Sequence, residues 1–136
     1  MRAIDTNVLM RALVRDDGVQ SSRAEALLTS GEKLYIPITV ILECEWVLRS
    51  RYGFSPKLIA EVIQGIAAMA NTVVGERDAV LAAATKAAQG WDFADALHHA
   101  LSVGCDDFVT LDAALVKRAA SLTKKGIQVA PKLTKL

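Results

Sequence analysis

The sequence predicts an α/β fold in which a central, mainly parallel β-sheet is covered by helices on both faces. Short β-like runs alternate along the chain with longer runs of helical periodicity, and this alternation is typical of a parallel sheet. The length of 136 residues is that of one ordinary domain. With 52% hydrophobic residues the chain can bury a substantial core, which excludes intrinsic disorder. We therefore expect a single domain over residues 1–136.

The first half of the chain contains three predicted strands and four predicted helices. Ser55 and Pro56 supply an N-cap followed by proline at the first helical position, and Thr39 can cap the helix before them. Gly31 stands just past the end of a helical run and stops it. The expected order is a strand ending at Ile4, helices over 6–14 and 20–29, a strand over 34–36, helices over 39–51 and 56–70, and a strand over 72–74.

The second half repeats the alternation of helices and strands. An alanine-rich helix ends at Gly90, and Asp92 caps the next one, which is expected to run to Gly104. The expected order is a helix over 77–89, a helix over 92–104, a strand over 108–110, a helix over 112–122 and a last strand over 127–129.

The distribution of charge along the chain limits the classes of function that the protein can have. Residues 1–112 carry all 15 acidic residues and 10 basic ones, whereas residues 113–136 carry six basic residues and no acidic one. A net charge of +1 argues against a protein that coats DNA with its whole surface. The basic tail fits either a local phosphate contact or an ordinary solvated face.

The chain carries no pattern of secretion or of membrane insertion. Two cysteines, Cys44 and Cys105, make no disulfide framework, and we expect both to be small buried hydrophobic residues in a reducing cytoplasm. An acid already at Asp5 is unlike a signal peptide. No apolar run approaches the roughly 20 residues of a membrane span.

Four aspartates stand where helices begin. Asp5 and Asp112 each follow a predicted strand, and ligands of parallel sheets bind beyond the carboxyl ends of the strands. We therefore expect both at one edge of the sheet, although each also suits a helix N-cap. Asp92 and Asp95 take the N-cap and N3 positions of one helix, which is compatible with Asp95 facing the same edge.

Glu43 and Glu45 lie two residues apart on one predicted helix. The neighbours of Glu43 three and four residues away are Thr39, Val40, Trp46 and Val47. This stripe is largely apolar, so one interpretation places Glu43 inside the protein, where a buried acid needs a partner or a metal. The alternative is that the stripe is half-exposed and Glu43 is solvated. Glu45 has Arg49 four residues on, which predicts a surface ion pair.

Carboxylates that converge on one spot repel one another, and a divalent cation relieves that repulsion. Mg²⁺ prefers oxygen ligands and often takes only one or two carboxylates directly. The sequence has neither a P-loop nor a Ser or Cys with an evident His partner, and His98 and His99 fit no zinc-binding spacing. When bound to a phosphate, such a cation can activate water and stabilise the charge that develops.

Four segments resemble, in order, the motifs of PIN-domain nucleases. They are DTNVL at 5–9, PITVILECEWVL at 37–48, DFADAL at 92–97 and TLD at 110–112. Leu111 stands where an aromatic residue is common in the family, a departure that concerns packing. The chain is also similar in size to the VapC-like toxins of this family.

The resemblance implies a PIN-like three-layer α/β/α fold and a Mg²⁺- or Mn²⁺-dependent endoribonuclease. It further implies the toxin of a type II toxin–antitoxin pair, a homodimer that a VapB-like antitoxin holds inactive. The catalytic acids that it implies are Asp5, Glu43, Asp95 and Asp112. Among them we expect Asp5 and Asp95 to bind the metal directly, with Asn7 and Thr110 positioning ligands or water.

Other functions remain open at this point. A phosphatase of the haloacid-dehalogenase type needs a second Asp where Asn7 stands, and the Asp106-Asp107 pair precedes the wrong strand for a receiver domain. An RNA-processing PIN nuclease without an antitoxin is the closest rival. A catalytically silent binding module is the alternative from another class, although all four acidic positions are filled.

Overall fold

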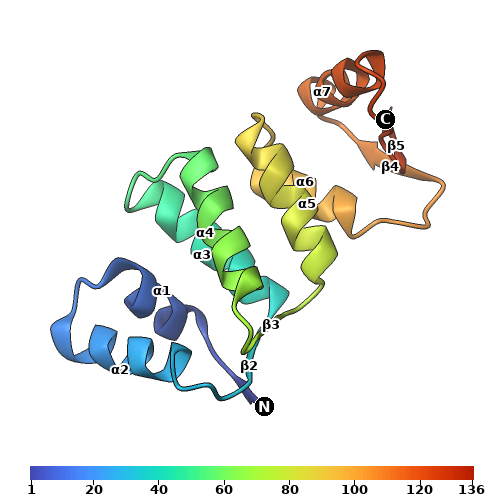
Figure 1. Ribbon diagram of the computed structural model, residues 1–136. Helices are drawn as coiled ribbons and strands as arrows, with labels where there is room; N and C mark the ends of the chain where they lie inside the picture. Colours follow the sequence, from blue (N-terminus) through green and yellow to red (C-terminus); the bar gives the residue numbers. More distant parts are fainter.

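The computed structural model describes all residues, 1–136, and contains seven helices and five short strands (Figure 1). Their order is β1 (Arg2–Ala3), α1 (Thr6–Val14), α2 (Gly18–Leu28), β2 (Leu34–Ile36), α3 (Ile38–Ser50), α4 (Pro56–Ala68), β3 (Thr72–Val74), α5 (Arg77–Ala88), α6 (Phe93–Ala100), β4 (Asp107–Thr110), α7 (Ala113–Lys124) and β5 (Lys132–Lys135). The predicted α/β class is confirmed, and every predicted helix is present.

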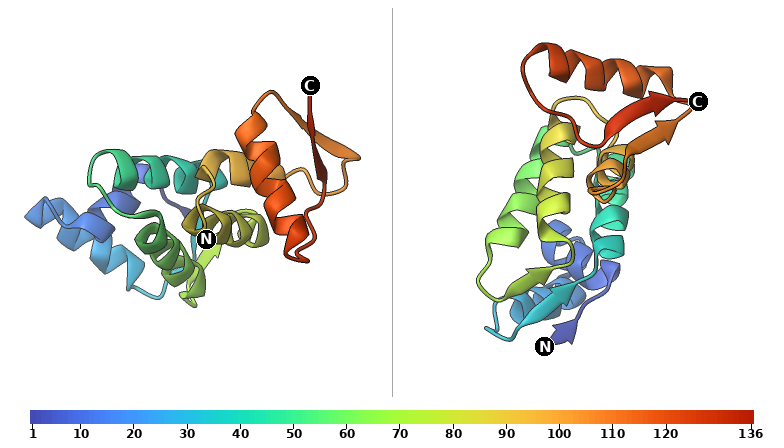
Figure 2. Two further views of the ribbon diagram at one scale, coloured as in Figure 1. Left: turned by 90° about the horizontal axis from the view of Figure 1, so that it is seen from above. Right: turned by 90° about the vertical axis from the view of Figure 1, so that its right-hand side faces the viewer.

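All paired strands are parallel, as predicted, but the strands form two separate ladders. The first has the order β1-β2-β3 and pairs Arg2 with Leu34. The second joins β4 and β5 and pairs Asp107 with Lys132. The two ladders lie toward opposite ends of the molecule, with helices between them (Figure 2). Strands β1 and β4 therefore each have one backbone edge without a strand neighbour.

Two predicted boundaries are wrong for identifiable reasons. Residues 127–129 form no strand, because the amide of Ile127 donates to the carbonyl of Leu122, 3.0 Å away, and so closes the end of α7. The last strand is β5, a polar segment in which only Leu133 is buried. The helix capped by Asp92 ends at Ala100, and turns rather than helix lead on to Gly104.

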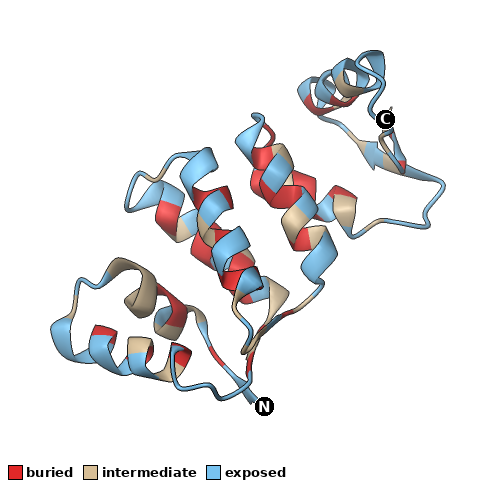
Figure 3. Cartoon of the chain, viewed as in Figure 1, coloured by how far each residue is buried: buried red, intermediate tan, exposed pale blue.

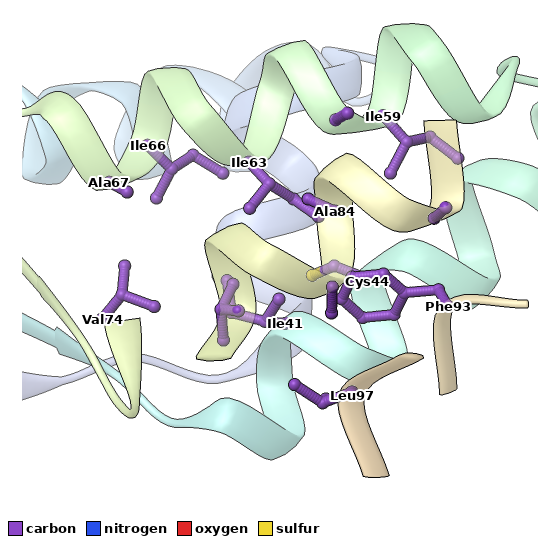
Figure 4. Close-up of a cluster of buried hydrophobic side chains, with 14 of the residues drawn as sticks. Ile41, Cys44, Ile59, Ile63, Ile66, Ala67, Val74, Ala84, Phe93 and Leu97 are labelled. Carbon is purple, nitrogen blue, oxygen red and sulfur yellow. The ribbon is translucent and has the colours of Figure 1, made fainter. Parts of the chain in front are cut away.

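The main core lies between helices. Buried positions gather on the facing sides of α3, α4, α5 and α6 (Figure 3). Figure 4 shows Ile41 and Cys44 of α3 beside Ile63 of α4 and Phe93 of α6. These residues belong to one cluster of 27 buried hydrophobic residues. Because α3 and α6 carry both core residues and predicted site acids, the core holds the site helices in place.

A buried histidine joins the C-terminal segment to the rest of the molecule. His99 is 1% exposed and packs between Trp91 and Phe108, with ring centroids 6.1 Å and 5.7 Å away. Its Nε2 lies 2.7 Å from the carbonyl oxygen of Pro131, and its Nδ1 lies 3.3 Å from Nζ of Lys86. The ring is therefore neutral, with Nδ1 accepting from the ammonium and Nε2–H donating to the carbonyl.

Two further findings concern the surface and the cysteines. None of the helices has both the length and the apolar character that crossing a membrane requires.

Cys44 is buried, as expected, but Cys105 is exposed, because it lies in the turns that follow α6 rather than in a helix.

Candidate functional site

Three of the singled-out aspartates cap helices, as the sequence allowed. One carboxylate oxygen of Asp5, Asp92 and Asp112 accepts from the backbone amide three residues on, at 3.0, 3.0 and 3.1 Å. These bonds fix each side chain at the N-terminus of α1, α6 or α7. The second oxygen of each carboxylate accepts no hydrogen bond from the protein and is available to a ligand.

Asp95 lies with Asp92 and Asp112 in the wall of one cavity, of about 300 Å³. Partial burial raises the pKa of the Asp95 carboxyl, and the negative charges of Asp92 and Asp112 raise it further. No hydrogen bond to the Asp95 side chain offsets this cost. The charges of Asp92 and Asp112 thus lie close enough to disfavour the charged form of Asp95, as expected of a cation site.

Asp5 and Glu43 form a second group, around Cys44. The pKa of the Cys44 thiol is raised to about 12, chiefly by burial and also by the charges of Glu43 and Asp5. Asn7 lines the cavity that contains Asp5 as well as the neighbouring cavity that contains Glu43. Asn7 thus borders the surroundings of both acids, and the supporting role expected of it stays a prediction.

Glu43 takes the exposed alternative that the sequence left open, whereas Glu45 is buried against expectation. Glu43 is exposed, since its face of α3 includes the exposed residues Thr39 and Trp46. Glu45 is only 5% exposed and lines the cavity of Asp95. The predicted pair with Arg49 is present, with Nε donating to Oε2 at 2.9 Å. The expectation of a surface pair was wrong, because periodicity located an apolar stripe without showing that α6 covers the other side of α3.

The four predicted catalytic acids therefore lie in two groups. Asp5 and Asp112 both follow strands, as predicted, but these strands belong to different ladders, so the two residues do not share one sheet edge. Asp5 lies with Glu43, and Asp95 lies with Asp112. No three carboxylate, histidine or cysteine side chains are grouped so that they surround one ion.

The group around Asp95 nevertheless has the chemistry of a magnesium site. Its donors are all carboxylate oxygens, and Mg²⁺ needs only one or two of them because it keeps several waters. A cation there would relieve the repulsion that raises the pKa of Asp95. Thr110 orients one of these donors, since its Oγ1 accepts from the backbone amide of Asp112 at 3.0 Å.

Two arginines line the same cavity and were not singled out as site residues. Arg49 lies close enough to Asp92 for that charge to raise its pKa, although its hydrogen bond with Glu45 is the larger cause. Arg118 lies on α7, six residues after Asp112, and forms no ion pair. The signal for Arg118 was present in the sequence, because α7 is capped by one of the predicted acids.

The comparison with protein families agrees with the α/β fold described above. The model of the PIN domain matches residues 3–122, a range that includes all four predicted acids and ends within α7. No curated protein and no solved structure gives a match. The family match covers most of the chain, and its members are nuclease-type domains that generally use divalent metals. The chain belongs to the PIN domain family.

Proposed function

We propose that this protein is a divalent-metal-dependent endoribonuclease and the toxin of a toxin–antitoxin pair. One arrangement carries the nuclease part of the proposal: Asp95 and Asp112 line the same cavity as the guanidinium groups of Arg49 and Arg118. Carboxylates suit a hard cation, and guanidinium groups suit a phosphate. Phosphodiester hydrolysis can use both kinds of group side by side, the carboxylates for a cation and the guanidinium groups for the phosphate.

Each residue in this cavity has a separate task under the proposal. Bound Mg²⁺ or Mn²⁺ supplies Lewis-acid activation of water and neutralises charge that develops on the phosphate. Asp95 holds the cation, and Asp112 contributes its uncapped carboxylate oxygen. Arg118 binds the phosphate and keeps it beside the carboxylates. Asp5 and Glu43 remain predicted members of the site, to which the family motifs assign them.

The toxin role implies a protein partner, and an exposed aromatic surface fits one. Trp46 is 54% exposed and Tyr52 is 39% exposed, and both line a cavity of about 410 Å³ that also contains Glu43. Large aromatic side chains are enriched in protein interfaces. We propose that a VapB-like antitoxin places an apolar helix over this surface and a basic side chain against the acid.

We also propose that the protein is a homodimer. Its accessible area is 7,954 Å², whereas a compact monomer of 14.6 kDa exposes about 6,900 Å². The excess of about 1,000 Å² is larger than the roughly 800 Å² per partner that a standard interface buries, so the surface can supply such an interface. The open edges of β1 and β4 add backbone groups that can pair with a second copy. Light scattering of the purified protein measures this directly.

Inducible expression tests the proposed function. Wild-type protein should arrest growth and produce new RNA 5′ ends, whereas Asp95→Asn should do neither while accumulating to the same level. Co-expression of the proposed VapB-like antitoxin should restore growth. RNA cleavage without growth arrest would favour a processing nuclease, and RNA binding without any metal-dependent cleavage would favour a silent binding module.

A further inference from the structure

A second cavity continues from the acidic one along α7. It has a volume of about 500 Å³ and lies between the end of α5 and one face of α7. Gly90, Trp91 and Arg118 line both cavities, which therefore adjoin. The second cavity has no carboxylate in its wall, whereas the first contains four. The charge of the wall thus changes from acidic to basic along one continuous groove.

The cations of this groove lie on a single face of α7. Arg118, Ser121 and Lys125 are spaced by three and four residues and all line the second cavity. Arg118 and Lys125 are exposed and form no ion pair with any acidic residue of the chain. Seven residues of helix separate them by about 10 Å. Two free cations at this separation suit an extended polyanion.

Gly90 lies against Arg118 where the two cavities meet. A Cβ at position 90 would be 3.4 Å from Nη1 of Arg118, which is an ordinary contact distance. Glycine is favoured here by its φ of +105°, which other residues rarely adopt. The position of Arg118 lets a phosphate bound to it lie next to Asp95 and Asp112.

We propose that this groove binds the backbone of single-stranded RNA and leads it to the acidic group, with Arg118 and Lys125 contacting phosphates. This inference rests on the proposed nuclease function and identifies the path of its substrate. Cavities of about 300 and 500 Å³ hold a few nucleotides of one strand. Trp91 is only 5% exposed and presents no face for base stacking, so the groove reads the backbone and tolerates different sequences.

The same helix provides a matched control. Lys117 and Lys124 are exposed residues of α7 that line neither cavity. The variants Arg118→Ala/Lys125→Ala and Lys117→Ala/Lys124→Ala lose the same net charge. Binding of a labelled 12-nucleotide RNA is measured by fluorescence anisotropy, in EDTA so that no cleavage occurs, over a series of salt concentrations. Thermal unfolding of both variants checks that they are folded.

The groove variant should bind the RNA at least about tenfold more weakly. Its slope of log affinity against log salt should fall by about 1.4, since each lost contact to a single strand removes about 0.7. The control variant should stay within about twofold of wild type with an unchanged slope. Equal losses in both variants, no binding by wild type, or equally tight binding of the matching duplex would each overturn the proposal.

Cleavage with Mg²⁺ separates this inference from the proposed function. RNA binding that depends on the groove, without cleavage, would refute the proposed nuclease function and still support the RNA-binding groove. A groove variant that binds and cleaves like wild type would refute the groove and the phosphate contact of Arg118, while metal-dependent cleavage by the acidic group would still be supported.

Discussion

Arg49 donates hydrogen bonds to both carboxylate oxygens of Glu45, at 2.9 and 3.3 Å, and the two side chains differ sharply in burial. The Glu45 side chain is 6% exposed and that of Arg49 is 42% exposed. The guanidinium therefore shields a buried charge at the mouth of the acidic cavity. Removing it leaves the carboxylate buried without its partner, which is more costly than losing an exposed ion pair.

Arg49→Ala should lower the free energy of unfolding by about 1–2 kcal/mol, because Glu45 loses both hydrogen bonds. Urea unfolding of the single variants and of Glu45→Gln/Arg49→Ala forms a double-mutant cycle. A coupling energy near zero would show that the pair behaves like an ordinary surface ion pair.

Glu43→Gln should abolish RNA cleavage and change the free energy of unfolding by no more than about 0.5 kcal/mol. The residue is exposed and accepts no hydrogen bond, so its amide analogue disturbs no packing. Cleavage assays beside urea unfolding measure both effects. Normal cleavage by this variant would remove Glu43 from the catalytic acids that the motif implies.

Asp95→Asn should raise the melting temperature of the metal-free protein at neutral pH. The substitution removes a carboxylate whose charge is disfavoured by burial and by Asp92 and Asp112. Added Mg²⁺ should stabilise wild type and not the variant, since a ligand that binds only the folded state raises its stability. Equal stabilisation of the two proteins would place the cation elsewhere. Removing the metal with EDTA should return wild type to its metal-free melting temperature.

His99 should make stability depend on pH between neutral and mildly acidic conditions. Burial lowers its pKa, and the neighbouring charge of Lys86 adds to this, against the opposing bond to Pro131. The unfolded state therefore binds the proton first, so stability is complete above the unfolded pKa of about 6.5 and falls as pH decreases toward the lower folded value.

Substitution isolates this effect. His99→Gln should flatten the dependence of unfolding free energy on pH between 5 and 7, because the amide does not titrate. His98→Gln, which removes an exposed imidazole on the same helix, is the control and should leave the dependence in place. A dependence that survives in His99→Gln would assign it to other groups.

Trp46→Ala should leave the stability of the isolated protein nearly unchanged and weaken antitoxin binding at least about tenfold. The indole is 54% exposed, so folding gains little from it, whereas an interface would bury it. Calorimetric titration of the antitoxin into both proteins measures the difference. Leu48 on the same helix is buried, so Leu48→Ala should instead lower the free energy of unfolding and serves as the contrast.

Local sequence signals were sufficient for most elements. The helix over 6–14 and the strands over 34–36 and 72–74 match α1, β2 and β3. Ser55, Asp92 and Asp112 cap helices as predicted, because capping depends on residues only three positions apart. The polar strand β5 was missed, since its four residues carry only one buried side chain and no hydrophobic pattern marks it.

By itself the sequence determined the α/β class, the parallel strands and most of the helix caps, because each of these depends on short-range pattern, whereas the expected Thr39 cap is absent since α3 begins at Ile38. Only the tertiary structure decided which acids lie together. Glu45 is buried rather than exposed because α6 packs on one side of α3, and Glu43 takes the exposed one of its two open alternatives. Asp5 and Asp112 were separated because β1 and β4 joined different ladders. Burial and strand neighbours are set by contacts between distant segments, and no local pattern encodes them.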